Sequence, residues 1–241
     1  MAIALPSPPG TDEKRIAAPV EPLENGDLLT AGAFLRRYEA MPHLKKAELI
    51  EGVVYMGSPV RLIHAEPDTL LQTWLGVYSA HTPGTAAASN ATVRLDADNV
   101  AQPDALLRLL PPCGGRCQVD SEGYLNGPPE LVVEIAAGSA SIDLRDKLRV
   151  YRRSGVREYL VWRTVENKFD WFVLDGDQYQ PNTPDVVGRL QSQVFPGLCL
   201  DVATLLARHS AQVLQDLQAA VQSPAHAAFV ARIAELGKTP P

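Results

Sequence analysis

The most constraining stretch of the chain is the apolar run Leu-Val-Val-Glu-Ile-Ala at 131–136, which follows Gly-Pro-Pro-Glu and precedes Ala-Gly-Ser. Its length and composition predict a central strand that is buried on both faces. Glu134 interrupts the run, and an ionised carboxylate in such a strand is costly unless it is paired, hydrogen-bonded or metal-bound. We therefore expect the strand to end at a cleft, because clefts form at the carboxyl ends of strands in open α/β sheets.

A second acid, Asp104, stands beside another run of Ala and Leu residues. It follows Pro103, which has no backbone N–H and therefore favours the start or the edge of a strand. Thirty positions separate Asp104 from Glu134, so only the fold can bring the two carboxylates together.

Lys147 follows the Glu134 strand on a helical segment in which Asp143, Lys147 and Tyr151 are spaced four residues apart. At 3.6 residues per turn these side chains share one helix face. If the helix begins just after the strand, Lys147 can reach back over the strand's end. The alternative is an Asp143–Lys147 pair on a solvated face, which contributes only about 0.3–0.5 kcal/mol.

Hydrophobic periodicity and turn residues predict the remaining elements. We expect a helix capped by Thr30, a strand pair or bent strand over 47–56 and a helix over 59–79. The segment 85–95 should end in a strand, 102–110 should form another, and 111–129 should be a loop. There follow a helix from Ser139 or Ser141 to Gly155, a hairpin of 158–162 with 168–174, one helical stripe over 202–221 and a short helix after Pro224. This order indicates the α/β (α+β) class, with a mixed β-sheet flanked by helices. We divide the chain into a disordered tail (1–25), one domain (26–206) and a C-terminal helical extension (207–241).

The charge balance excludes one class of protein. The chain of 241 residues carries a net charge of −6, whereas a protein that coats DNA without specificity should be basic. A local basic patch is still present, because Arg145, Lys147, Arg149, Arg152, Arg153 and Arg157 fall within thirteen residues. These arginines indicate either DNA contacts or a solvated helix face, and the sequence alone does not decide between the two.

The three cysteines fit a reducing cytoplasm better than a disulfide framework. Cys113 and Cys117 form a C-x-x-x-C with no second Cys/His pair nearby. Since structural zinc takes four ligands, a plain loop is favoured over a zinc site. The chain has neither a signal-peptide pattern at its start nor a membrane-length apolar stretch, so we expect no membrane contact.

The ordered set of motifs resembles a known family. The string AELIEG…GSPVRLIH…QPD…PELVVEI…D…K…Y…GVREYLVW…Y…FPGL, which extends from about Thr30 to Leu205, is similar to the bacterial restriction-endonuclease family Uma-two of the PD-(D/E)xK nuclease superfamily. No single motif is specific, but the ordered set is. The chain departs from the family pattern at Val53, where an acid is usual, and at Ala137-Gly138, where the family has Ser-Pro.

The resemblance implies a restriction-endonuclease-like fold and roles for five residues. Asp104 and Glu134 correspond to the two acids that would bind Mg²⁺ or Mn²⁺. Lys147 corresponds to the catalytic lysine, which is placed on the helix here; position 136, where the standard motif has lysine, is alanine. Glu48 matches an early acid that could hold a second ion or a water, and His64 could orient one of these groups or contact phosphate.

The expected function is therefore metal-dependent hydrolysis of DNA phosphodiester bonds. Arg145, Arg149, Arg152 and Arg153 are the candidate DNA contacts, and the resemblance implies a homodimer. Two alternatives stay open. The first is a catalytically inactive nucleic-acid-binding or assembly module of the same fold. The second is a hydrolase with an acid/base carboxylate pair, as in glycosidases, in which Lys147 has no explanation.

Overall fold

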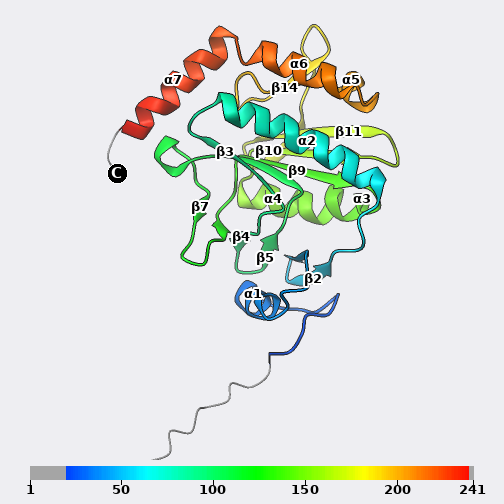
Figure 1. Cartoon of the computed structure of the whole chain (residues 1–241). Helices are drawn as coiled ribbons and strands as arrows, with labels where there is room; N and C mark the ends of the chain where they lie inside the picture. Colours follow the sequence, from blue (N-terminus) through cyan, green and yellow to red (C-terminus); the bar gives the residue numbers. More distant parts are fainter. Residues whose placement is uncertain (1–19, 239–241) are drawn as a thin grey trace, which may run out of the picture.

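The strand that carries Glu134 lies in the interior of the largest sheet, as its apolar composition predicts. The computed structural model describes residues 20–238. In it, β9 (Leu131–Ala136) lies between β6 (Ala105–Leu109) and β10 (Glu158–Arg163), and all six of its residues are buried. β9 is parallel to β10 and antiparallel to β6. The prediction of a mixed sheet flanked by helices is confirmed (Figure 1).

This main sheet has the strand order β12–β11–β10–β9–β6–β3. Its other strands are β3 (Thr85–Ser89), β11 (Lys168–Asp175) and β12 (Gln178–Pro181). β10 and β11 form the predicted antiparallel hairpin. The predicted turn after Asp175 leads into β12, and Gly176 has a positive φ of 58° there, a backbone conformation that glycine adopts readily.

A second sheet lies beside the main one, in the order β2–β1–β5–β4–β8–β7. Its strands are β1 (Ala47–Ile50), β2 (Val53–Met56), β4 (Val93–Asp96), β5 (Asn99–Ala101), β7 (Gln118–Val119) and β8 (Leu125–Asn126). β1 and β2 are the predicted strand pair. The segment 111–129 is not loop throughout, because it contains β7, β8 and the short 3-10 turn η1 (Pro111–Cys113). Strands of two residues are too short to give a periodic signal.

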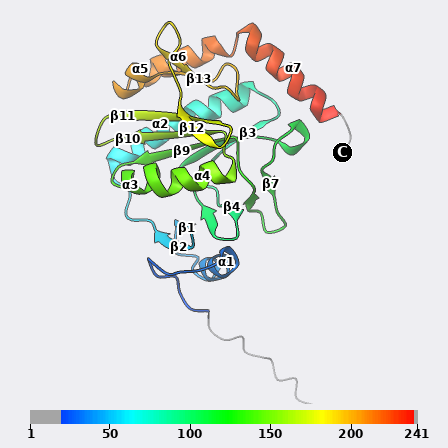
Figure 2. The same ribbon diagram turned by 180° about the vertical axis from the view of Figure 1, so that it is seen from behind.

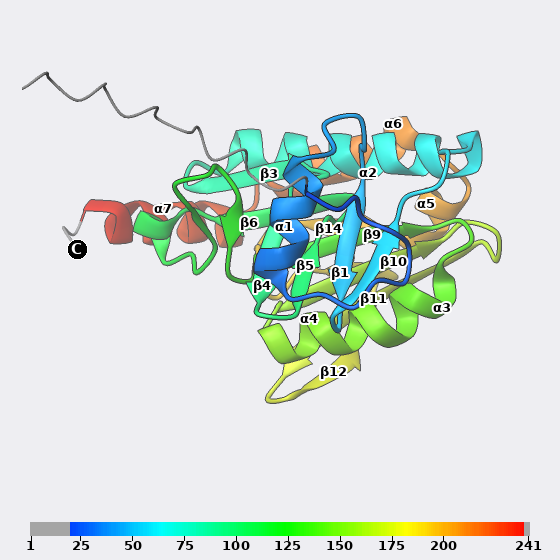
Figure 3. The ribbon, with the colours of Figure 1, turned by 90° about the horizontal axis from the view of Figure 1, so that it is seen from below.

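The helix predicted after Thr30 is α1 (Ala31–Glu39), and the Thr30 side chain accepts a hydrogen bond from the Ala33 N–H. α1 packs on the second sheet, as the view from below shows (Figure 3). The disordered tail predicted for 1–25 lies outside the described residues up to position 19. From residue 20 onward it is wrong, because Leu23 is only 3% exposed and packs in the same cluster as Phe34.

Helices cover both faces of the main sheet (Figure 2). α2 (Leu62–His81) packs on one face, where the indole of buried Trp74 donates to the backbone carbonyl of Cys199. The segment of α3 (Ala140–Ile142), the π-helical turn η2 (Asp143–Lys147) and α4 (Leu148–Ser154) lies against the other face. α4 ends at Gly155, as predicted, with a positive φ of 84°. None of the described helices combines the length and the hydropathy that crossing a membrane requires.

The C-terminal helices add a further layer over α2 (Figure 1). After the small sheet of β13 (Arg189–Gln191) and β14 (Cys199–Asp201), the chain forms α5 (Val202–Leu206), α6 (Ser210–Ala220) and α7 (Pro224–Lys238). The prediction of one helical stripe over 202–221 is wrong, because the chain breaks at Arg208, which has a φ of 58°. Val213, Leu217, Phe229 and Ile233 belong to the same core cluster as Trp74, so the segment from 207 onward completes the core of the domain.

The loop before β14 depends on one buried carboxylate. Glu158, the first residue of β10, is fully buried and accepts hydrogen bonds from the Ser192 hydroxyl at 2.8 Å and from the backbone N–H groups of Gln193 and Val194 at 2.7 and 3.1 Å. We predict that Glu158→Ala lowers the free energy of unfolding by about 2–3 kcal/mol, because it leaves buried donors unpaired. Glu158→Gln keeps an acceptor at this position and should cost less than half as much. Urea denaturation of the two variants distinguishes these results, and equal losses would contradict the assigned hydrogen bonds.

Candidate active site

The Lys147 ammonium joins three elements of the fold. Its Nζ lies 2.8 Å from Glu48 Oε2 on β1, 2.9 Å from Glu134 Oε1 on β9 and 3.6 Å from Asp143 Oδ1 on η2. Lys147, Glu48, Glu134 and Asp143 are all buried. The structure thus brings Lys147 over the Glu134 strand. The alternative of a solvated Asp143–Lys147 pair does not hold, because this pair exists but is buried.

The segment that carries Lys147 differs from the predicted regular helix. Residues Asp143–Lys147 form a π-helical turn, a feature that is rare and often occurs at functional sites. Two hydroxyl groups hold the first residue of the turn: Ser139 donates to Asp143 Oδ2 at 2.5 Å, and Tyr159 donates to the Asp143 carbonyl at 3.0 Å. Tyr151, on α4, donates to Glu134 Oε1 at 2.9 Å.

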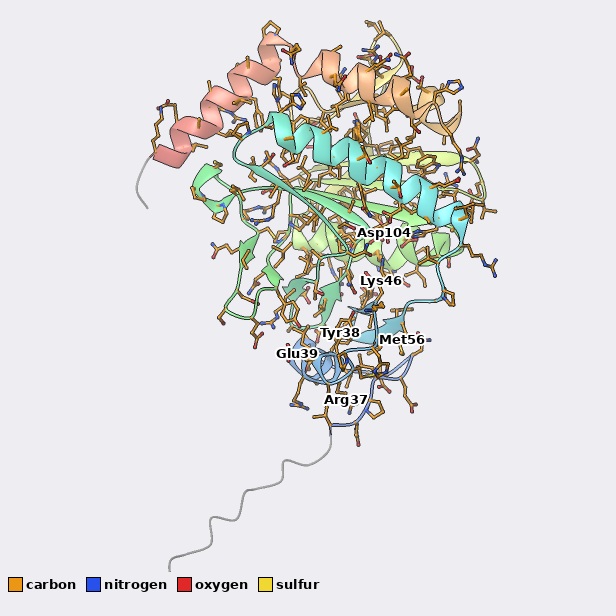
Figure 4. All side chains as sticks on the ribbon, viewed as in Figure 1. Arg37, Tyr38, Glu39, Lys46, Met56 and Asp104 are labelled. Atoms are coloured by element: carbon orange, nitrogen blue, oxygen red, sulfur yellow. The ribbon has the colours of Figure 1, made fainter. Side chains whose placement is uncertain are left out.

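Asp104 immediately precedes β6 and connects the two sheets. Its Oδ1 lies 2.7 Å from Lys46 Nζ, and its Oδ2 accepts from the Ile135 backbone N–H at 2.8 Å and lies 3.3 Å from His64 Nε2. Figure 4 shows Lys46 and Asp104 adjacent to each other where the two sheets meet. Asp104 is therefore held against the backbone of the strand that carries Glu134.

Sequence reasoning missed Lys46. A signal was present, because Lys46 and Glu48 are two positions apart, and alternate residues of a strand lie on the same side. The paired Lys45-Lys46 in a polar stretch concealed it. Glu48 itself is held by the Gln102 backbone N–H at 2.8 Å, and the Gln102 side chain accepts from the Tyr38 hydroxyl at 3.1 Å.

Comparisons with known proteins identify the family to which this chain belongs. Residues 33–203 match the family model Uma2, whose description is "Putative restriction endonuclease". The chain belongs to this family. No curated protein matches the chain. Among solved structures, the fold is similar to that of a "putative nuclease belonging to DUF820" from Anabaena variabilis ATCC 29413, with 12% identity and a TM-score of 0.55 over 72% of this chain and 97% of that chain. The similarity confirms a nuclease-like fold.

In this Uma2-family protein, the acidic groups outnumber the basic ones at the site. Four carboxylates, those of Glu48, Asp104, Glu134 and Asp143, are paired with two ammonium groups, those of Lys46 and Lys147. His64 lies 3.3 Å from Asp104 Oδ2, and this contact raises the pKa of the histidine. Two negative charges are therefore uncompensated when His64 is neutral, and one is uncompensated when it is protonated. Such an excess is costly in a buried cluster, and it can be relieved by a proton or by a cation.

The perturbed pKa values follow from this arrangement. Burial, opposed by Lys147, raises the pKa of Glu134 above the usual value for a glutamic acid. Burial would also raise the pKa of Asp104, but His64 and Lys46 hold it well below its usual range. Burial alone would lower the pKa of Lys147, and the carboxylates of Glu134, Glu48 and Asp143 instead raise it. Asp104 therefore stays ionised, whereas Glu134 is the acid that competes for a proton.

The donor set suits a hard divalent cation. Mg²⁺ takes oxygen ligands and retains several waters, so one or two protein carboxylates and a substrate phosphate suffice. Asp104 and Glu134 are the candidates, as the family pattern implies. Within residues 20–238, no group of three or more His, Cys, Asp or Glu side chains is arranged to hold a metal ion, so protein ligands alone would supply at most two of the positions around it. Cys113 and Cys117 are buried free thiols.

The arginines of the basic segment face away from the carboxylate cluster. Arg149 Nη2 lies 2.6 Å from Glu51 Oε2 and 2.7 Å from Asp146 Oδ1, and Arg153 Nη1 lies 3.2 Å from Glu51 Oε1. Arg152 donates to the Asp177 carbonyl, and Arg145 is exposed. The charges of Arg149 and Arg153 are thus partly neutralised by acidic side chains of the same chain. This agrees in part with the alternative that these arginines form a solvated helix face. Their role in binding DNA stays a prediction.

The raised pKa of Glu134 predicts a pH dependence. Its folded-state pKa lies above its unfolded-state value, so ionisation destabilises the folded protein as pH rises from about 4.5 towards the folded-state pKa. In chelator, the wild type should therefore lose stability relative to Glu134→Gln over this range and then level off. Urea titrations of both proteins at several pH values provide the measurement. If the wild type instead gained stability with pH, the Lys147 ion pair would outweigh burial and the assignment would be wrong.

Proposed function

We propose that the protein is a Mg²⁺- or Mn²⁺-dependent endonuclease that hydrolyses DNA phosphodiester bonds. The observation that carries this proposal is the excess of acidic groups over basic ones in a buried cluster at the end of β9. A cluster that served only the fold would be expected to match its charges, because unpaired buried charges are strongly destabilising. Membership of the Uma2 family supports the same activity.

Asp104 and Glu134 would hold the ion. When bound, a divalent ion neutralises phosphate charge and lowers the pKa of a water ligand. The chain's own residues set the geometry around it. The Ile135 N–H and His64 orient Asp104, while Tyr151 and Lys147 hold Glu134 through Oε1. Lys147 assists the attacking water by fixing Glu134 and Glu48, and Glu48 is placed to hold a water or a second ion.

One observation favours the alternative of an inactive binding or assembly module. Asp104 and Glu134 already have cationic partners, Lys46 at 2.7 Å and Lys147 at 2.9 Å. A module that has lost its metal could keep its fold through such pairs. The two functions differ in one measurable property, which is metal-dependent cleavage.

We predict that the purified protein nicks supercoiled plasmid in Mg²⁺ or Mn²⁺ and is inactive in chelator. Asp104→Asn and Glu134→Gln should each reduce the rate at least about 100-fold, because each removes a charged ligand. Glu130→Gln is the matched control. Glu130 is also buried and stands at the opposite end of β9, where it accepts from the Leu109 N–H. Equal cleavage by wild type and both site variants would contradict the proposal.

The structure also changes the stability expected for Asp104→Asn. From the sequence, two carboxylates gathered for a metal should repel each other, so the substitution would be neutral or stabilising without metal. Asp104 instead contacts Lys46, His64 and the Ile135 N–H. We therefore expect a modest loss of stability in chelator, and the activity of this variant should be measured well below its Tm.

DNA binding should depend on the basic segment if Arg145, Arg149, Arg152 and Arg153 bind phosphates. Replacing all four with alanine should then reduce the slope of log K against log salt by about 0.9 for each phosphate that the variant no longer neutralises. Fluorescence anisotropy with a labelled duplex measures this slope. An unchanged slope would assign the arginines to a solvated face and to their pairs with Glu51 and Asp146. The proposed homodimer would present one such site to each strand.

A further inference from the structure

The two lysines of the site differ in what their ammonium groups can still bind. An ammonium has three N–H donors. The ammonium of Lys147 lies 2.8 Å from Glu48, 2.9 Å from Glu134 and 3.6 Å from Asp143, and only 6% of its side chain is exposed. Lys147 could reach a substrate only by leaving these buried ion pairs, and the three carboxylates would then remain buried without a counter-charge.

Lys46 is in the opposite situation. Its Nζ has one carboxylate contact, with Asp104 Oδ1 at 2.7 Å, and 28% of its side chain is exposed. Among residues 20–238, no other hydrogen bond or ion pair of the Lys46 side chain is found, so its ammonium can still donate to a ligand.

The position also suits a phosphate contact. A phosphodiester is an anion, and it must approach a cluster in which carboxylates outnumber lysines. Lys46 is the ammonium of this cluster that reaches solvent, and it touches the carboxylate assigned to the metal. Position 136, where the standard motif of the superfamily has its lysine, holds a buried alanine.

We propose that Lys46 is the catalytic lysine that contacts the scissile phosphate, and that Lys147 is a positioning residue. This proposal rests on the proposed nuclease function. In it, the ammonium of Lys46 donates to a non-bridging phosphate oxygen and stabilises the charge that develops there, while Lys147 fixes Glu134 and Glu48. Lys46 thus contacts the substrate, and Lys147 holds the carboxylates of the site in place.

The test compares Lys46→Met, Lys46→Arg and Lys147→Met, with Lys45→Met as the matched control. Lys45 is the adjacent, exposed lysine, and only its backbone carbonyl has a contact near the site, from the Gln102 amide at 3.5 Å. Each variant is examined by thermal melting, by plasmid nicking in Mg²⁺ and Mn²⁺, and by anisotropy of a labelled duplex in Ca²⁺ at several salt concentrations.

Lys46→Met should lower the melting temperature less than Lys147→Met does, because Asp104 keeps His64 and the Ile135 N–H as partners. It should cleave at least about 100-fold more slowly, as for a missing transition-state donor, and reduce the salt slope by about 0.9. Lys46→Arg should keep the slope and restore part of the cleavage. Lys147→Met should lower the melting temperature and leave the slope unchanged, because its charge does not meet DNA.

The outcomes separate the two proposals. If the wild type cleaves and Lys46→Met cleaves and binds like Lys45→Met, the nuclease stands and the role of Lys46 is overturned. If the wild type does not cleave but Lys46→Met still lowers the salt slope, the phosphate contact is supported within an inactive DNA-binding protein. If the wild type neither cleaves nor binds DNA, both proposals fail.

Discussion

The candidate site depends on one buried interaction, that of the Lys147 ammonium with the carboxylates of Glu48, Glu134 and Asp143. The three acids come from β1, β9 and η2, so this single cation connects the second sheet, the main sheet and the helical layer. A buried ion pair contributes little net stability. The loss of one partner is nevertheless costly, because the remaining charges stay buried without compensation. Lys147 therefore acts less as a source of stability than as a constraint on where these acids lie.

The sequence predicts the elements of the site better than their contacts. The apolar run around Glu134 indicates a buried strand, and the proline before Asp104 indicates a strand start; both are local properties of strands. The convergence of Asp104 with Glu134 depends on the pairing of β6 with β9, which no local pattern specifies; the resemblance to a nuclease family supplied it. The break in the helix at Arg208 has no sequence signal, because the flanking residues contain no glycine or proline. The π-helical turn has none either, because the spacing of its side chains is close to that of an α-helix.

Charge explains why Lys46 matters to the site and why its sequence did not reveal it. A lysine in a polar stretch is ordinary, and Lys46 differs from Lys45 in its partial burial and in its 2.7 Å approach to Asp104. With this contact, the site has two ammonium groups in different environments, one fully enclosed by carboxylates and one partly open to solvent. The same low-dielectric cluster raises the pKa of Glu134 while Lys46 and His64 keep Asp104 ionised, so the two acids are unequal before any ligand binds.

The central claim is that Asp104 and Glu134 form a divalent-cation site. Anomalous diffraction from crystals soaked in Mn²⁺ tests it most directly, because it locates the ion without depending on a substrate or on the choice of DNA. The account predicts an anomalous peak about 2.1–2.3 Å from oxygen atoms of both carboxylates, which disappears in Glu134→Gln. A Mn²⁺-soaked crystal with no peak at these residues, and with the contacts of Lys46 and His64 to Asp104 intact, would contradict it.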